Sequence, residues 1–149
     1  MTDRVLKRSA RLQWLTSPPS GAGRLAVASG AFSVVKISLA LEDPIPGQTT
    51  PSELFACTVA GYLGMHLSLR MRENQSPLRE LTVDANLTIS PWPEYVTQSI
   101  EFDVIARLDG HEALDESAFR DHAEQTLATV AKSLCLSDRL LHLAGARLQ

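Results

Sequence analysis

The pattern of hydrophobic and polar positions predicts strands in the first third of the chain. Apolar residues alternate with polar ones in segment 9–16, which is the period of a half-buried strand. The apolar segments 24–29 and 31–41 follow. Ser29-Gly30 between them predicts a short hairpin turn.

A long apolar helix is predicted after these strands. Thr50 suits the N-cap and Pro51 suits the first helical position. Glu53 follows the cap by three residues, as in a capping box. The helix should run to about Glu73, shortly before a proline. Its middle, ELFACTVAGYLGMHLS at 53–68, is apolar on every side, which is typical of a helix buried within a protein.

The pattern in the second half of the chain predicts further strands and helices. Segments 81–89 and 96–108 alternate cleanly, so we expect a long antiparallel hairpin with one face toward water. Asp115 can cap a second helix. A short third helix at 136–144 and a last short strand at 146–149 complete the expected elements. The buried stripe of the second helix is predicted to consist of Phe119, Ala123, Leu127, Val130 and Leu134.

This order of elements predicts an α+β fold in a single domain, residues 1–149, with antiparallel β-sheets around the long central helix. A single sheet covers only one side of a helix that is apolar all round. We therefore expect a second copy of the chain to cover the rest, which makes a homodimer.

Composition narrows the class of protein. Hydrophobic residues make up 44% and charged residues 21%, as is ordinary for a soluble globular protein. The net charge is −3, and no cluster of Lys and Arg suggests nucleic-acid binding. No segment has the length of a membrane span or the apolar core of a signal peptide. Two cysteines are too few for a secreted disulfide scaffold, so we expect a cytoplasmic protein without membrane attachment.

Two motifs resemble those of one protein family. TTPSELFACTVAGYLGMHLS at 49–68 is similar to the central-helix motif of the OsmC/Ohr family, the osmotically inducible and organic-hydroperoxide-resistance proteins. SLCLSDRLL at 133–141 is similar to the family's second motif, in which Cys-Pro-(Ile/Val)-Ser precedes an apolar helix. The resemblance implies an intertwined homodimer with active sites near the subunit interface. It also implies oxidative-stress defence by a cysteine pair that reduces organic hydroperoxides and is recycled by a dithiol, with no bound cofactor.

Only part of the family's active-site residues has a counterpart in this sequence. The peroxide-attacking cysteine falls on Tyr62, and the second, resolving cysteine falls on Cys135. The glutamate that orients a catalytic arginine falls on Ser52, with Glu53 one place away, and the arginine belongs to a loop near Arg24. Peroxide reduction of this kind needs a thiolate. A phenol, which ionises only at about pH 10, cannot take that role.

The two cysteines have different expected roles. Cys57 precedes Tyr62 by five residues, which places it about 140° around the helix axis and about 7.5 Å along it. It lines up instead with Gly61 and other small residues, where another backbone can approach, so we expect it to fill space. Cys135 is expected where the second helix gives way to the third, and a helix N-terminus stabilises a thiolate. It also adjoins the buried stripe, so a redox thiol and a packed side chain both remain open.

The other face of the central helix carries a candidate pocket. A tyrosine and a histidine four residues apart on this face can touch. Together with neighbouring side chains they would bind a small apolar molecule or an organic hydroperoxide. The alternative is a core helix whose tyrosine and histidine find hydrogen bonds. The predicted pocket residues are Tyr62, His66, Glu53, Arg24, Thr58 and Met65.

Three functions remain open at this point. The chain could reduce organic hydroperoxides through Cys135, with Cys57 joining after local rearrangement. It could instead be a binding protein that holds a small apolar molecule in the same pocket. A hot-dog-type thioesterase or acyl-binding domain, with Glu53 or His66 at the helix, is disfavoured by the strand order. No spacing of His and Cys typical of a zinc site occurs, so no metal is expected.

Overall fold

The computed structural model describes residues 5–14, 22–32, 35–38, 45–90, 94, 96–110 and 114–149. They belong to two compact units, an N-terminal unit (Met1–Leu54) and a C-terminal unit (Phe55–Gln149). The single domain expected from the sequence stays a prediction. No helix in the described ranges is long and apolar enough to span a membrane.

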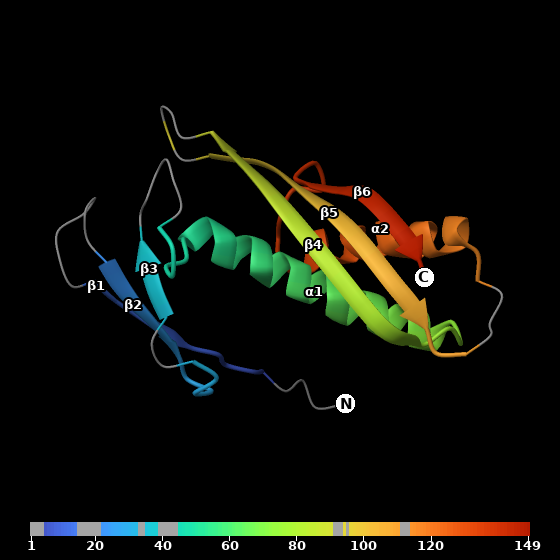
Figure 1. Cartoon of the computed structure of the whole chain (residues 1–149), viewed down its shortest axis with the longest axis horizontal. Helices are drawn as coiled ribbons and strands as arrows, with labels where there is room; N and C mark the ends of the chain where they lie inside the picture. Colours follow the sequence, from blue (N-terminus) through green and yellow to red (C-terminus); the bar gives the residue numbers. More distant parts are fainter. Residues whose placement is uncertain are drawn as a thin grey trace. The chain divides into compact units, whose positions relative to one another are not determined.

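The N-terminal unit contains a small antiparallel sheet. Its strands β1 (Ala10–Trp14), β2 (Ala22–Val27) and β3 (Val35–Ser38) lie in the order β1-β2-β3 (Figure 1). The predicted turn between β2 and β3 is confirmed, since the N–H of Gly30 donates to the Val27 carbonyl at 3.0 Å. Gly30 has a φ of 74°, a conformation that costs glycine little. The ends of the predicted strands at 15–16 and 39–41 lie outside the described residues.

Helix α1 (Pro51–Glu73) begins with the predicted capping box. The N–H of Thr50 donates to Oε2 of Glu53 at 2.8 Å, and the N–H of Glu53 donates to Oγ1 of Thr50 at 3.2 Å. The preceding residue is fixed to β3, because the N–H of Ser38 donates to the Thr49 carbonyl at 2.8 Å. The start of the helix is therefore set by its own side chains and by the edge of the small sheet.

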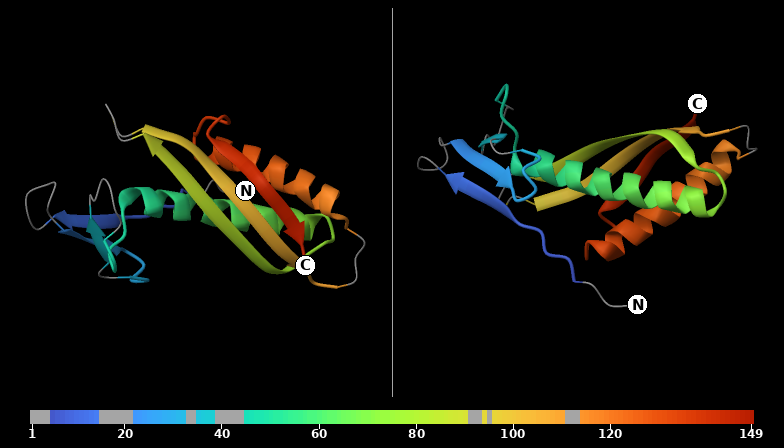
Figure 2. Two further views of the ribbon diagram at one scale, coloured as in Figure 1. Left: turned by 45° about the horizontal axis from the view of Figure 1, so that its top comes forward. Right: turned by 90° about the horizontal axis from the view of Figure 1, so that it is seen from below.

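The C-terminal unit is a three-stranded sheet with helices on one face (Figure 2). Strands β4 (Leu78–Ser90) and β5 (Val96–Leu108) form the predicted long antiparallel hairpin. Helix α2 (Glu116–Ser133) leads to β6 (Leu141–Leu148), which pairs with β5 in parallel. The alternation in the hairpin follows from this layering, because only one face meets the helices.

The core of this unit lies between the sheet and the two helices. The sheet and each helix turn one apolar side toward the core, so the core is a single layer of side chains. Four of the five residues of the predicted α2 stripe belong to it, and the fifth, Leu134, is half-buried against it. The fully buried core side chains include Val59, Leu63, Leu67, Met71, Ile100, Phe102, Val104, Phe119 and Val130.

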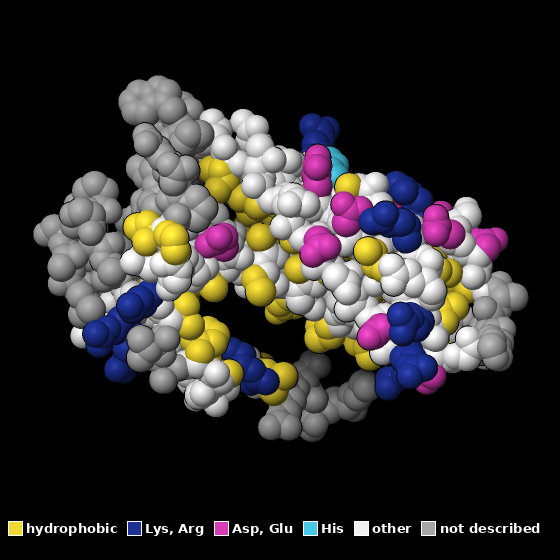
Figure 3. Space-filling view, viewed as in Figure 1, with side chains coloured by type: hydrophobic (Ala, Val, Ile, Leu, Met, Phe, Trp, Pro, Cys, Tyr) yellow, Lys and Arg dark blue, Asp and Glu magenta, His cyan; other side chains and the backbone are white. Residues whose placement is uncertain are grey.

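The outward face of the same sheet is polar. Figure 3 shows Lys, Arg, Asp and Glu side chains spread over this side of the C-terminal unit. Arg107 Nη1 lies 3.1 Å from Oε2 of Glu80, its cross-strand neighbour. Both side chains are largely exposed, so this ion pair adds little to stability. The charges keep this face in water and leave the helix side as the only buried one.

The predicted third helix at 136–144 is wrong. A turn in which the N–H of Leu140 donates to the Ser137 carbonyl at 3.0 Å leads directly into β6. The segment pairs with the free edge of β5, where the N–H of Ile100 donates to the Leu140 carbonyl at 2.8 Å. The last strand is accordingly longer than the expected 146–149. Short apolar runs fit either element, and the open sheet edge decided between them.

Two valines of β5 test this assignment of the core. Val104 is fully buried, whereas Val96 is 49% exposed. Val104→Ala should lower the free energy of unfolding by about 1.5–3 kcal/mol, because it removes packed methyl groups. Val96→Ala in the same strand should change it by less than about 0.5 kcal/mol. Urea denaturation measures both, and equal losses would contradict the proposed layering.

Candidate functional site

The part of helix α1 that belongs to the C-terminal unit buries only one of its sides there. The buried side consists of Ala56, Val59, Leu63, Leu67 and Met71. On the opposite side three large apolar residues face solvent: Tyr62 is 37% exposed, Met65 51% and Leu69 41%. The helix is apolar all round, as expected, but the C-terminal unit covers only half of it.

The exposed side of α1, hereafter the α1 outer face, carries four of the predicted pocket residues. The rings of Tyr62 and His66 stack, with centroids 6.2 Å apart and planes inclined by 26°. Thr58 and Met65 are exposed on the same side, and His66 is half-buried at its border. The predicted contact between the tyrosine and the histidine is confirmed. It creates a flat aromatic surface with a hydroxyl and an imidazole at its edge.

Cys57 is exposed at the other border of the α1 outer face. In the single chain it is therefore not a buried packing residue. Of the small residues aligned with it, Gly61 faces open space. A Cβ at Gly64 would lie 3.6 Å from Leu81 Cδ2 of β4, an ordinary packing distance. Within this stripe Gly64 lies beside the sheet, whereas Cys57, Gly61 and Ser68 are exposed.

Cys135 lies at the C-terminal end of α2, not at a helix N-terminus. Its N–H donates to the Lys132 carbonyl at 3.2 Å, and the N–H of Leu136 donates to the Ala131 carbonyl at 2.9 Å. Together with a φ of 53° at Cys135, these bonds form a Schellman motif. The expected stabilisation of a thiolate by a helix N-terminus is thus wrong, because this end of a helix carries carbonyl oxygens and negative partial charge.

Cys135 is exposed and occupies a backbone position that glycine usually takes. Gln75 takes the equivalent position after α1 with a φ of 59°. There the N–H of Ser76 donates to the Met71 carbonyl at 2.9 Å. The chain thus ends both long helices with a strained non-glycine residue, and only the second of these carries a reactive side chain.

The remaining predicted residues belong to the N-terminal unit. Oε2 of Glu53 accepts the capping hydrogen bonds and one from Oγ1 of Thr49 at 3.1 Å, so this carboxylate serves the helix start. Arg24 is exposed on β2, directly opposite Lys36 of β3. Within the described residues no ion pair joins Arg24 to Glu53.

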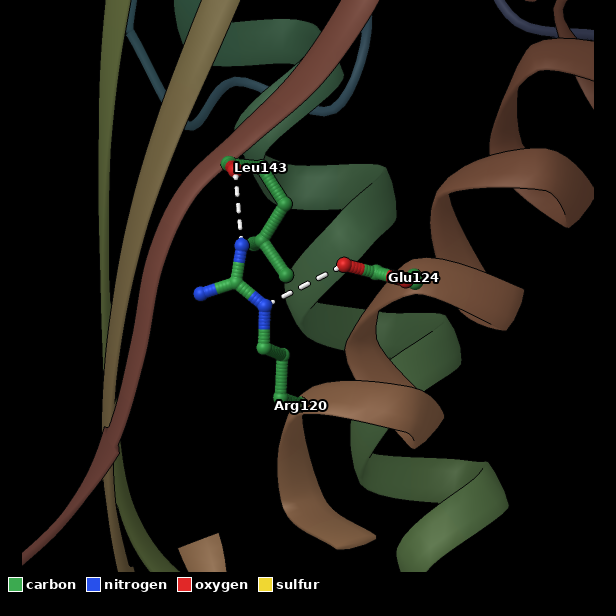
Figure 4. Close-up of polar contacts among 3 residues, drawn as sticks. All are labelled: Arg120, Glu124 and Leu143. Atoms are coloured by element: carbon green, nitrogen blue, oxygen red, sulfur yellow. Dashed lines mark hydrogen bonds and ion pairs between the residues drawn. The ribbon is translucent and has the colours of Figure 1, made fainter. Parts of the chain in front are cut away.

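A cavity that the sequence-based predictions did not include lies between α2 and β6. Its volume is about 320 Å³. Arg120 spans the two elements, with Nε 3.2 Å from Oε1 of Glu124 and Nη2 donating to the Leu143 carbonyl at 3.4 Å (Figure 4). The cavity could not be foreseen while 136–144 was expected to be a helix. Its lining residues are Glu124, Leu127, Ala128, Ala131, Asp138, Leu141, His142 and Leu143.

No model of a known protein family matches the sequence, and no curated protein matches it. Solved structures do match. An OsmC-like protein of unknown function from Vibrio cholerae has a TM-score of 0.72 at 11% identity, over 95% of this chain and 99% of that one. An organic hydroperoxide resistance protein from Elizabethkingia anophelis, crystallised with thiocyanate, has a TM-score of 0.69 at 14% identity, over 99% of each chain.

A third match is the organic hydroperoxide resistance protein OhrB of Bacillus subtilis. Its TM-score is 0.58 at 13% identity, over 95% of this chain and 98% of that one. These likenesses cover nearly the whole of each chain. The chain therefore has the OsmC/Ohr-like α+β fold that its central-helix motif indicated.

Substitutions at Cys135 test the backbone geometry there. Cys135→Gly should raise the free energy of unfolding by about 0.5–1 kcal/mol, because glycine adopts positive φ without steric cost. Cys135→Val should lower it by about 1 kcal/mol or more, since β-branched residues fit this conformation worst. Gln75→Gly is the matched control and should give a similar gain. Thermal unfolding of the three variants decides the question: a loss of stability in Cys135→Gly alone would show that the thiol packs.

Proposed function

We propose that this chain acts in oxidative-stress defence, on organic hydroperoxides. The support is its OsmC/Ohr-like fold, together with two thiols that both face solvent. Two of the similar structures are named as organic hydroperoxide resistance proteins. The proposal transfers that class of substrate to this chain and assigns the chemistry to its own residues.

The reaction requires a thiolate and a source of two electrons. In the proposed step, the Cys135 thiolate attacks one peroxide oxygen and the O–O bond breaks. The product alcohol leaves with a proton from solvent, and the sulfur becomes a sulfenic acid. A second thiol, either Cys57 or an external dithiol, condenses with the sulfenic acid, forms a disulfide and releases water. A dithiol reductant then restores both thiols by exchange.

The exposure of Cys135 is the observation that carries this assignment. A peroxide can reach a sulfur that faces solvent, and Cys135 is the residue that the resemblance matches to the family's second cysteine. A direct Cys57–Cys135 bridge would require the two Cα atoms to come within about 7 Å. Resolution by an external dithiol has no such requirement.

We further propose that the protein is a homodimer in which a second copy covers the α1 outer face. Large apolar side chains on that face are 37–51% exposed and lie on one side of a single helix. A contiguous exposed apolar surface of this kind marks an interaction site. The small residues Cys57, Gly61 and Ser68 allow a partner backbone to approach closely along the same helix.

A second function is favoured by the stacked pair Tyr62–His66. The pair lies where the family resemblance places the peroxide-attacking cysteine, and it offers a flat apolar surface with polar groups at its edge. A small apolar molecule could bind there without any redox chemistry. In that case the protein would be a binding member of the fold.

Hydroperoxide consumption distinguishes the two functions. The reduced protein should consume cumene hydroperoxide in the presence of dihydrolipoamide. Cys135→Ser should lower the rate at least about 100-fold, because it removes the sulfur that attacks the peroxide in the proposed step. Cys57→Ser, the matched control, should retain most of the rate if an external dithiol resolves the sulfenic acid. A Cys135→Ser variant with the original rate would refute the assignment.

Binding of the neutral dye Nile red measures the alternative. A wild-type protein that leaves the hydroperoxide intact, and that binds the dye more weakly after Tyr62→Ala but not after Ser133→Ala, would favour the binding function. Ser133 is exposed on α2 and serves as the control.

The mass in solution tests the homodimer. Light scattering should give twice the chain mass of 16.3 kDa. Met65→Glu should shift the protein to single chains, because a charge would be buried in an apolar contact. Ser117→Glu, at an exposed site on α2, should leave the dimer intact. A wild-type protein with the mass of one chain would contradict the proposal.

A further inference from the structure

We infer that the cavity between α2 and β6 binds a small organic ammonium ion, a molecule with one ammonium group on a short apolar body. This site involves neither cysteine and does not depend on the proposed redox function. The inference rests on three properties of the cavity: its size, its apolar floor and the distribution of charge along its rim.

The size suits a ligand of modest length. The cavity holds about 320 Å³, at the lower end of the range for small-molecule sites. On the helix side, Ala128 and Ala131 stand where longer side chains would fill the space. The opening therefore results from two alanines on the face of α2 that meets β6.

The floor of the cavity is apolar. Leu127, Ala131 and Leu141 line the cavity and are almost completely buried, and Leu143 beside them is half-buried. A hydrated metal ion or a fully polar solute would gain nothing from these walls. A short hydrocarbon body would remove their remaining surface, and its own, from water.

The rim carries an unbalanced negative charge. Glu124 is already paired with Arg120, whose guanidinium also holds the Leu143 carbonyl and so bridges one end of the cavity (Figure 4). Asp138 lines the cavity from the turn before β6, and among the described residues no ion pair engages it. A ligand cation would lie beside this carboxylate and the apolar floor, whereas the same carboxylate would repel a ligand anion.

These features select a monovalent cation with an apolar body. The ammonium group would lie at Asp138, with His142 of β6 at the same rim, and the hydrocarbon part would lie against the leucines. A charge-assisted hydrogen bond to a carboxylate is about twice as strong as a neutral one, so the contact to Asp138 should dominate the selectivity.

Hexylammonium is a suitable probe, with hexanoate and hexanol as comparators of the same length. Titration of the full ¹⁵N-labelled chain with hexylammonium chloride should shift the amide signals of the α2 residues 124–131 and of 138–143 in a saturable way. Hexanol should bind more weakly, and hexanoate should cause no saturable shift at equal concentration. Saturable binding of hexanoate with the affinity of hexylammonium would overturn the inference.

Two variants locate the site. Asp138→Asn should raise the Kd for hexylammonium about tenfold, by loss of the charge-assisted bond. Asp121→Asn, an exposed carboxylate on α2 outside the cavity, should leave the Kd unchanged. Ala128→Trp should abolish binding by filling the cavity. Because both Asp138 and Ala128 are exposed, these variants should retain the fold, which circular dichroism confirms. An unchanged Kd in Asp138→Asn, or no saturable shift in the wild-type protein, would refute the site.

Discussion

The structure depends on one constraint: the middle of helix α1 is apolar on all sides, but the C-terminal unit covers only one of them. The covered side supplies four fully buried residues to the core beneath the three-stranded sheet. The other side leaves Tyr62, Met65 and Leu69 in contact with water. Apolar surface of this extent along a single helix is unfavourable in a lone chain. The proposed homodimer and the proposed pocket both follow from this unbalanced burial.

The residues with reactive or polar side chains lie at different positions on the two helices. The α1 outer face holds Tyr62 and His66 near one border and Cys57 near the other, so the aromatic surface and this thiol are distinct features of one helix. Cys135 lies on a different element, at the end of α2, in a conformation usual for glycine. The C-terminal end of a helix does not stabilise an anion. In the proposed reaction the helix therefore does not assist the thiolate, and what favours the reaction is the exposure of this sulfur to solvent.

Local chemistry made much of the fold predictable from the sequence. The capping box at Thr50 and Glu53 fixed the start of α1, and strict alternation fixed the long hairpin, because both signals involve residues close in sequence. The segment that became β6 was misassigned, since its pairing with the distant edge of β5 leaves no local trace. The cavity behind β6 was missed for the same reason. The positive φ at Cys135 was equally hidden, because the usual glycine signal is missing there.

The central claim is that a second copy of the chain covers the α1 outer face, and the two cysteines offer a direct measurement without any substitution. The alkylation rate of each thiol can be followed by mass spectrometry over a wide range of protein concentration. The account predicts that labelling of Cys57 slows as concentration rises and chains associate, while labelling of Cys135 at the end of α2 stays constant. Equal and concentration-independent labelling of both thiols would contradict it.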